Sequence, residues 1–317
     1  MSVTIVPVSL PGERVTGIIN AATSHDGVSP FSEQFLNGLH DGDLQHRHLI
    51  ARDGDIDVAV AAIAPDGSVE LVVDPSRRRE NIGAQLIAQV HKRSADSTES
   101  PAFWAHGNLD AAQAAAQALG MNATRELLKM SLDRSHLETI TATEPQANTA
   151  QGPVPAGYIL VSYPDAVARW GRDEVEQQWL RVNNDAFSWH PEQGGWDLGR
   201  LHRGMAADWF EPEGVWFLYT DPDKTDGGEA ARMAGFHWTK RHGDGVGEVY
   251  VVGLASSFRG EGLGAPLMHA GLSHLAEAGS SQVILYVEAD NQAAVKRYNE
   301  TGFTVAETHV VYQFPVN

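Results

Sequence analysis

Residues 251–264 read VVGLASSFRGEGLG, an apolar run followed by a loop that contains one arginine and three glycines. The apolar run predicts a strand, and residues 265–278 carry apolar side chains at helical spacing directly after the loop. The first N–H groups of such a helix and the positive end of its dipole face one point, where a pyrophosphate is stabilised. Glycine suits the loop because the backbone there must adopt left-handed or close-approach conformations. The stretch therefore predicts a phosphate-binding loop between a strand and a helix.

A second copy of this arrangement lies about 180 residues earlier in the chain. Residues 70–83 read ELVVDPSRRRENIG, and an amphipathic helix is predicted at 84–91. In each copy a further strand follows, at 102–105 and 283–288, and then a helix that begins at an asparagine, Asn108 or Asn291. A chain of 317 residues is about twice the usual length of one domain. The repeat therefore predicts two tandem domains.

Each half also begins with helical and strand patterns of its own. Helices are predicted at 13–23 and 174–184, and β-branched or alternating runs predict strands at 57–64, 68–73, 215–220, 234–240 and 248–254. The fold class that follows is α/β, in the sense of a mixed α+β sheet flanked by helices in each half. A stretch rich in Thr, Glu, Pro, Gln and Asn, without apolar periodicity, separates the halves. We expect an N-terminal domain at 1–136, a linker at 137–155 and a C-terminal domain at 156–317.

Composition excludes several classes of protein. The 23 Lys and Arg against 41 Asp and Glu give a formal net charge of −18, which opposes binding to nucleic acid or to an anionic membrane. The absence of cysteine excludes disulfides, thiolate nucleophiles and cysteine metal sites. No helical His-x-x-x-His pair occurs at a metal-binding spacing among His46, His48, His190, His202, His237 and His242, so no metal is expected. We expect a cytoplasmic protein, since no targeting segment or long apolar run is present, and a monomer is the simplest expectation.

The motifs of the second half together resemble the GNAT superfamily of acyl-CoA-dependent N-acetyltransferases. They are the strand, the loop Arg259-x-x-Gly262-x-Gly264, the helix, the next strand and the Asn-led helix that carries Tyr298. The resemblance implies that the loop holds the pyrophosphate of acetyl-CoA, that the preceding strand pairs with the pantetheine, and that Tyr298 protonates the departing thiolate. The acetyl-CoA contacts expected in the second half are Val252, Gly253, Leu254, Arg259, Gly260, Glu261, Gly262, Leu263, Gly264, Ala265, Asn291, Gln292, Ala293, Ala294, Val295 and Lys296. Their counterparts in the first half are Leu71, Val72, Val73, Arg79, Glu80, Asn81, Ile82, Gly83 and Ala84.

The whole chain is similar to the tandem members of this superfamily that acetylate the cysteinyl amine of a glucosaminyl-inositol, a small-molecule thiol precursor. The matching stretches are 182–187, 190–196, 236–240, 247–253 and 285–288. This resemblance implies that the pseudodisaccharide is contacted by Glu33, Glu192, Lys240, Glu248 and Tyr286. Without it, Glu192 could be a rim carboxylate, Lys240 a surface lysine and Tyr286 a sheet-packing side chain, and the match around Glu33 is short.

Glu248 and Tyr298 are the two expected catalytic residues. Glu248 begins the strand that leads to the loop, so its carboxylate could take a proton from an attacking amine, directly or through one water. Tyr298 follows Asn291 by about two helical turns, on a face that could point at the sulfur. A solvated strand-end glutamate and a core tyrosine are the alternatives.

The first half lacks these groups. Aligning Gly83 with Gly264 places Gly67 opposite Glu248, Ala115 or Ala116 opposite Tyr298, and Asn81 opposite Gly262, the first glycine of the Arg-x-x-Gly-x-Gly motif. Asparagine tolerates left-handed geometry, so acetyl-CoA binding in the first half stays open. We therefore expect a non-catalytic first domain. The alternative functions are acetylation of another amine, such as an aminoglycoside or a protein N-terminus, and a silent acetyl-CoA-binding scaffold.

Overall fold

The computed structural model describes residues 3–94, 100–142, 154–190, 193–223 and 230–315. The chain divides into two compact units. The first comprises Met1–Leu128, Glu288–Asp290 and Glu307–Asn317, and the second comprises Lys129–Val287 and Asn291–Ala306. Two strands, β6 (Asn122–Asp133) and β12 (Thr304–Gln313), have residues in both units.

The first unit is a mixed sheet with helices on both faces. Its strands follow the order β1-β2-β3-β4-β5-β12, and all neighbouring pairs are antiparallel except β4 and β5. The strand bounds are β1 Thr4–Val8, β2 Arg47–Asp53, β3 Ile56–Ile63, β4 Ser68–Val73 and β5 Ala102–Ala105. The helix bounds are α1 Gly12–Asp26, α2 Glu33–Gly38, α3 Ile82–Arg93 and α4 Asp110–Ala118, with short 3-10 helices η1 Gly42–Leu44, η2 Pro75–Arg77 and η3 His106–Asn108. One apolar core packs α1 and α2 against the sheet, and another packs α3.

The second unit repeats this plan. Its strands follow the order β11-β10-β9-β8-β7, in which only β10 and β11 are parallel. The strand bounds are β7 Tyr158–Ser162, β8 Val215–Thr220, β9 Met233–Arg241, β10 Val246–Leu254 and β11 Gln282–Glu288. The helix bounds are α5 Arg134–Ala142, α6 Tyr163–Trp170, α7 Arg172–Ala186, α8 Leu198–Met205, α9 Gly264–Glu277 and α10 Gln292–Thr301, with η4 Pro212–Gly214 and η5 Ser256–Phe258.

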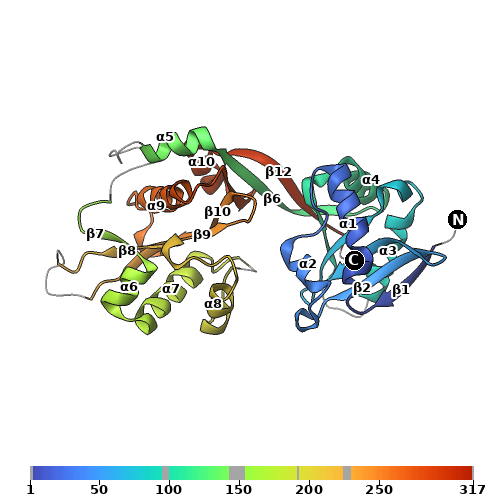
Figure 1. Cartoon of the computed structure of the whole chain (residues 1–317), viewed down its shortest axis with the longest axis horizontal. Helices are drawn as coiled ribbons and strands as arrows, with labels where there is room; N and C mark the ends of the chain where they lie inside the picture. The colour runs from blue at the N-terminus through green and yellow to red at the C-terminus, as the bar shows by residue number, and fades with distance from the viewer. Residues whose placement is uncertain (1–2, 95–99, 143–153, 191–192, 224–229, 316–317) are drawn as a thin grey trace. The chain divides into compact units, whose positions relative to one another are not determined.

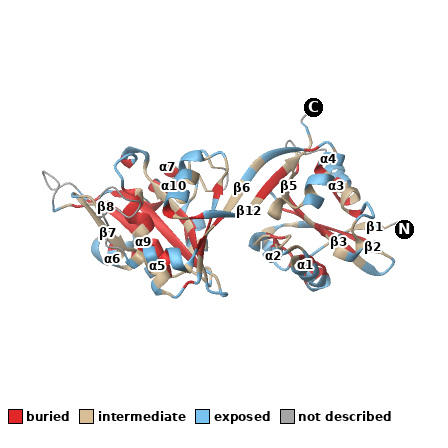
Figure 2. Cartoon of the chain, turned by 90° about the horizontal axis from the view of Figure 1, so that it is seen from above, coloured by how far each residue is buried: buried red, intermediate tan, exposed pale blue. Residues whose placement is uncertain are grey.

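The helices of the second unit cover both faces of its sheet. Figure 1 shows α6, α7 and α8 on one side of β8 and β9, and α9 on the other. The α7 face is aromatic, with Trp179 and Trp238 buried against each other, and the α9 face is aliphatic, with Leu263 and Leu267. In Figure 2 the buried residues, drawn in red, lie mainly along the strands. The expected mixed α/β class is confirmed.

The predicted linker and domain limits differ in part from the helices and the compact units of the structure. Residues 134–142 form α5, so the first part of the predicted linker is helical, and 143–153 lie outside the described residues. The last strand, β12, pairs with β5 in the register Val310↔Ala105, which assigns the chain from Glu307 onward to the first unit. The limits 1–136 and 156–317 follow the repeat rather than spatial contact, and they stay a prediction.

Candidate active site

Strand register brings three of the predicted substrate residues to one face of the second unit. In the antiparallel pair of β9 and β10, Lys240 lies opposite Glu248, and in the parallel pair of β10 and β11, Glu248 lies opposite Ile284. Tyr286 is two residues beyond Ile284 and so shares its face of the sheet. Lys240 and Glu248 are each 7% exposed, whereas Tyr286 is 45% exposed. The face therefore places a buried cation and a buried carboxylate next to an accessible tyrosine.

The Glu248 carboxylate has a partner that the sequence analysis missed. His242 Nε2 lies 2.7 Å from Glu248 Oε2. His242 follows β9 at a tight hairpin, where its backbone N–H donates to the backbone carbonyl of Val246 at 2.8 Å. Residue 242 is two positions beyond Lys240, and its contact with Glu248 places its side chain on the same face as Lys240 and Glu248. The motif Gly243-Asp244-Gly245 between two predicted strands was the available signal for this hairpin.

Aromatic rings hold the Lys240 side chain. Its ammonium lies 4.7 Å from the centroid of the Trp209 ring and 5.9 Å from that of Tyr250. The quadrupole of each ring attracts the cation, which offsets part of the cost of burying it. Trp238 packs against both rings. The Lys240 ammonium group is thus positioned beside the rings of Trp209 and Tyr250, where it can donate hydrogen bonds.

Beyond Glu248, strands β10 and β11 separate. Their last paired residues are Val249 and Leu285, and a bulge in the β9–β10 pairing falls between Val249 and Val251. From Val251 to Leu254, β10 is paired with β9 only, within the described strands. Its backbone groups on the β11 side are therefore available to an extended ligand such as a pantetheine arm.

The loop after β10 has the expected left-handed glycines. Gly260 and Gly262 adopt φ angles of 86° and 78°, a region that side chains disfavour. Helix α9 begins at Gly264, so its first N–H groups face the loop. A Cβ atom at Gly264 would meet no heavy atom closer than 3.8 Å, which leaves room beside the helix start. Arg259 donates to the carbonyl of Ala186 at 3.2 Å.

Tyr298 lies on α10 and is half-buried, with its ring against that of Phe303 at a centroid distance of 6.0 Å. Burial raises the pKa of Tyr298 to about 12, so its hydroxyl keeps its proton at neutral pH. Asn291 caps this helix, since its Oδ1 accepts from the N–H of Ala294 at 3.2 Å. The helix thus presents a phenol that can donate a proton.

Comparison with known proteins decides the family. Residues 177–303 match the acetyltransferase (GNAT) family. The mycothiol acetyltransferase of Corynebacterium aurimucosum is 49% identical over 305 residues, which cover 95% of this chain and 94% of that protein. The mycothiol acetyltransferases of Corynebacterium efficiens and Corynebacterium diphtheriae are 46% and 43% identical, again over 95% of this chain and over 92% and 93% of their own. The chain belongs to the mycothiol acetyltransferase family.

Solved structures show the same fold as this family member. A tandem GNAT protein from the clavulanic acid biosynthesis pathway has a TM-score of 0.65 at 18% identity, with all of both chains covered. A GCN5-related N-acetyltransferase from Sphaerobacter thermophilus has a TM-score of 0.67 at 18% identity, covering 97% of this chain and 94% of that one. The tandem GNAT-like fold is therefore confirmed.

The first loop of this mycothiol acetyltransferase family member has left-handed residues at the same positions as the second loop. Arg79 and Asn81 adopt φ angles of 68° and 63°, at the positions that correspond to Gly260 and Gly262. Asn81 thus takes the left-handed conformation that its side chain tolerates. The short helix η2 before the loop likewise corresponds to η5.

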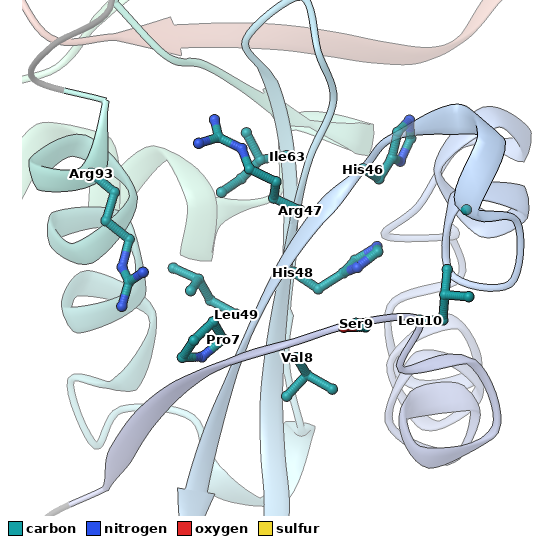
Figure 3. A pocket seen from close by; sticks show the side chains of 11 residues that line it. Pro7, Val8, Ser9, Leu10, His46, Arg47, His48, Leu49, Ile63 and Arg93 are labelled. Atoms are coloured by element: carbon teal, nitrogen blue, oxygen red, sulfur yellow. The ribbon is translucent and has the colours of Figure 1, made fainter.

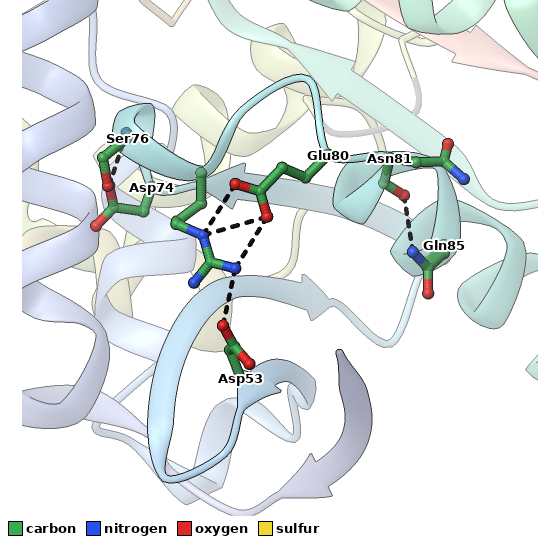
Figure 4. Close-up of polar contacts among 7 residues, drawn as sticks. Asp53, Asp74, Ser76, Glu80, Asn81 and Gln85 are labelled. Carbon is green, nitrogen blue, oxygen red and sulfur yellow. Dashed lines mark hydrogen bonds and ion pairs between the residues drawn. The ribbon is translucent and has the colours of Figure 1, made fainter. Parts of the chain in front are cut away.

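The charges of the two loops differ. Arg78 makes two hydrogen bonds to Asp26, at 2.7 and 2.6 Å. Arg77 bonds to Glu80 and to Asp53, and Figure 4 shows these two carboxylates on either side of one guanidinium group. Arg78 holds the pKa of Asp26 below its ordinary value, and Arg77 does the same for Glu80. These carboxylates offset the positive charge that would attract a pyrophosphate to the first loop.

Strand register does not assign the other two predicted substrate residues to this face. Glu33 begins α2 in the first unit, where it is exposed, and Glu192 lies outside the described residues. Gly67, which aligns with Glu248, has a φ of 86° in the turn before β4.

A cavity of about 810 Å³ in the first unit includes none of the predicted site residues. Figure 3 shows His46 and His48 on one side of β2, and Arg47 and Arg93 on the other. His48 is 2% exposed, and burial lowers its pKa to about 4, so its ring is neutral at physiological pH. Within the described ranges there is no group of three or more side chains that could hold a metal ion, and no helix is long and apolar enough to span a membrane.

Proposed function

We propose that the protein transfers the acetyl group of acetyl-CoA to the cysteinyl amine of cysteinyl glucosaminyl-inositol, which gives mycothiol. The protein is an acetyl-CoA-dependent N-acetyltransferase of the mycothiol acetyltransferase family, whose reaction is the final step of mycothiol biosynthesis. The observation that carries the proposal is the shared face of Lys240, Glu248 and Tyr286, beside the point where β10 and β11 separate.

Acetyl-CoA fits the second loop. Left-handed Gly260 and Gly262 turn the backbone, and the open space beside Gly264 suits a pyrophosphate at the start of α9. The residues proposed to hold the cofactor are those expected from 252–254, 259–265 and 291–296. Acetyl-CoA supplies the acetyl group as an activated thioester.

Glu248 is the proposed base. An α-amine has a pKa of about 7.7 and attacks only when it is neutral, so a carboxylate that accepts its proton accelerates the reaction. The amine nitrogen bonds to the acetyl carbon, the carbon–sulfur bond breaks, and the amine proton passes to Glu248, directly or through one water. Burial favours this role because the carboxylate is shielded from bulk solvent.

Tyr298 is the proposed acid. Its raised pKa, about 12, keeps the phenol protonated through the neutral range, so it can donate to the thiolate as the carbon–sulfur bond breaks. The proton then returns to the phenol from solvent. This role needs proximity to the sulfur rather than an ionised tyrosine.

The remaining predicted residues serve recognition in this proposal. Lys240 and Tyr286 donate to hydroxyls of the pseudodisaccharide, and Glu192 and Glu33 accept from them or hold the amine. The first domain is non-catalytic, and its balanced loop charges support weaker acetyl-CoA binding there than in the second. Cytoplasmic location, action as a monomer, independence of a metal and the absence of nucleic-acid or membrane partners stay predictions.

The deciding experiment incubates the protein with acetyl-CoA and the cysteinyl precursor. The acetylated product and free coenzyme A are measured by mass spectrometry, because the precursor's own thiol would react with a thiol reagent. Parallel reactions contain an aminoglycoside or a peptide with a free N-terminus. Faster turnover of one of these would favour acetylation of another amine, and acetyl-CoA binding without turnover of any amine would favour the scaffold.

A further inference from the structure

We propose that His242 is a positioning residue for Glu248, and that protonation of its ring switches the proposed base to a weaker form. This inference rests on the proposed function, since it assigns Glu248 the role of base. It adds a residue to the site and a pH control on the reaction.

The geometry fixes one oxygen of the carboxylate. His242 Nε2 lies 2.7 Å from Glu248 Oε2, which is a short distance for a nitrogen–oxygen hydrogen bond. Oε1 makes no hydrogen bond to another residue in the described part of the chain. The contact therefore orients the carboxyl group so that Oε1 is left for the amine or for a bridging water.

The contact also selects the tautomer of the ring. An ionised carboxylate only accepts hydrogen bonds, so a neutral His242 must carry its proton on Nε2 and leave Nδ1 unprotonated. The His242 side chain is 30% exposed, whereas that of Glu248 is 9% exposed. Water can thus protonate the imidazole while the carboxylate stays buried.

Protonation of His242 changes the base without moving it. An imidazolium in contact with Glu248 stabilises the ionised carboxylate and lowers its affinity for a proton. The hydrogen bond persists, but the carboxylate is then a weaker acceptor for the proton of the amine. The rate should therefore fall at acidic pH through His242, in addition to the effect of protonating the amine itself.

The other ionisable groups around Glu248 come from three elements. Lys240 faces it from β9, Tyr286 shares its face on β11, and Asp244 lies in the hairpin, where it accepts from the N–H of Val246. On the opposite face, Arg241 binds Glu211, which His274 also contacts at 3.4 Å. Among these groups, His242 is the one with a hydrogen bond to the Glu248 carboxylate.

The test compares His242→Gln with His242→Ala. Glutamine keeps an N–H donor of similar reach but does not titrate, whereas alanine removes the donor. We measure kcat and kcat/KM for the cysteinyl precursor between pH 5.5 and 9.5, with circular dichroism to check folding. His242→Gln should stay within about threefold of wild type at pH 9 and gain relative to wild type as the pH falls. His242→Ala should lose about tenfold in kcat at pH 9, because the carboxylate is no longer oriented.

A matched control uses a second histidine–glutamate contact in the same unit. His202 Nε2 lies 2.7 Å from Glu176 Oε2 on α7, again with a buried carboxylate and a more exposed ring. His202→Gln should leave the pH profile unchanged. The inference would be overturned if the pH–rate profiles of both His242 variants matched that of wild type. It would also be overturned if both variants lost the same fraction of kcat and kept the wild-type decline in rate at acidic pH. Wild type without turnover of the precursor would instead refute the proposed function, and a fully active Glu248→Gln would refute the base.

Discussion

Cofactor binding and chemistry should be separable by one substitution made at two equivalent glycines. The change is to valine, at Gly264 at the start of α9 and at Gly83 at the start of α3. A Cβ atom would lie 3.8 Å from Arg297 and Leu254 at Gly264, and 3.6 Å from Val73 at Gly83, which are ordinary contacts. Neither glycine has a positive φ, so valine is compatible with both backbones. The two variants should therefore fold alike.

The expected losses differ because only the second loop is proposed to hold the cofactor that reacts. Valine at 264 would occupy the space proposed for the pyrophosphate and displace it from the N–H groups of α9. Each hydrogen bond to a charged group contributes about 1.5–3 kcal/mol, so losing two costs about 3–6 kcal/mol. That corresponds to a rise of about 10²-fold or more in the KM for acetyl-CoA. Gly83→Val should keep kcat/KM within about twofold of wild type.

Steady-state kinetics and calorimetric titration with acetyl-CoA measure both quantities, and thermal melts compare folding. Titration of Gly83→Val also reports how many molecules of acetyl-CoA bind to each protein chain. If this variant bound one molecule fewer than wild type, the first domain of wild type would bind acetyl-CoA. The reasoning is refuted if Gly83→Val melts like wild type yet loses catalysis as completely as Gly264→Val.

Three further substitutions test the proposed roles in the second unit. Glu248→Gln should lower kcat by about 10²-fold near neutral pH and by less in alkali, where the amine is already neutral; a loss independent of pH would remove Glu248 from the base role. Tyr298→Phe should lower kcat and leave acetyl-CoA affinity nearly intact, and wild-type activity should show no loss from tyrosine ionisation until the pH approaches about 12, since the protonated phenol is the active form. Unchanged turnover in Tyr298→Phe would assign that residue to packing. Glu192→Ala should raise the KM for the precursor far more than that for acetyl-CoA, and equal increases in both would count against a recognition role.

Local patterns in the sequence predicted the elements that carry the site. The strand at 68–73 has the predicted bounds, and α9 begins and ends one residue before its predicted limits, because apolar periodicity and glycine are local signals. The pattern could not show that β12 joins β5, since the choice of strand partner depends on residues far apart in the chain.

The parts of the site that the sequence analysis missed are side-chain pairings. The contact of His242 with Glu248 depends on the register of a hairpin, and the ion pair of Arg78 with Asp26 depends on how α1 packs beside the first loop. Residue type alone identified Arg78 as a cation but not its partner. Whether such a cation is available to a ligand is decided by tertiary packing, which short motifs do not encode.

The pairing of β12 with β5 has a consequence for how this protein is made. The strand that completes the sheet of the first unit follows the whole of the second unit in the chain, so it is synthesised after that unit. Domains usually complete their folding in the order of synthesis. Here the edge of β5 in the nascent N-terminal sheet lacks its final partner until the second unit and β12 have been synthesised. A fragment that stops at residue 136 would carry that exposed edge permanently, which makes it a candidate for aggregation rather than an independent domain.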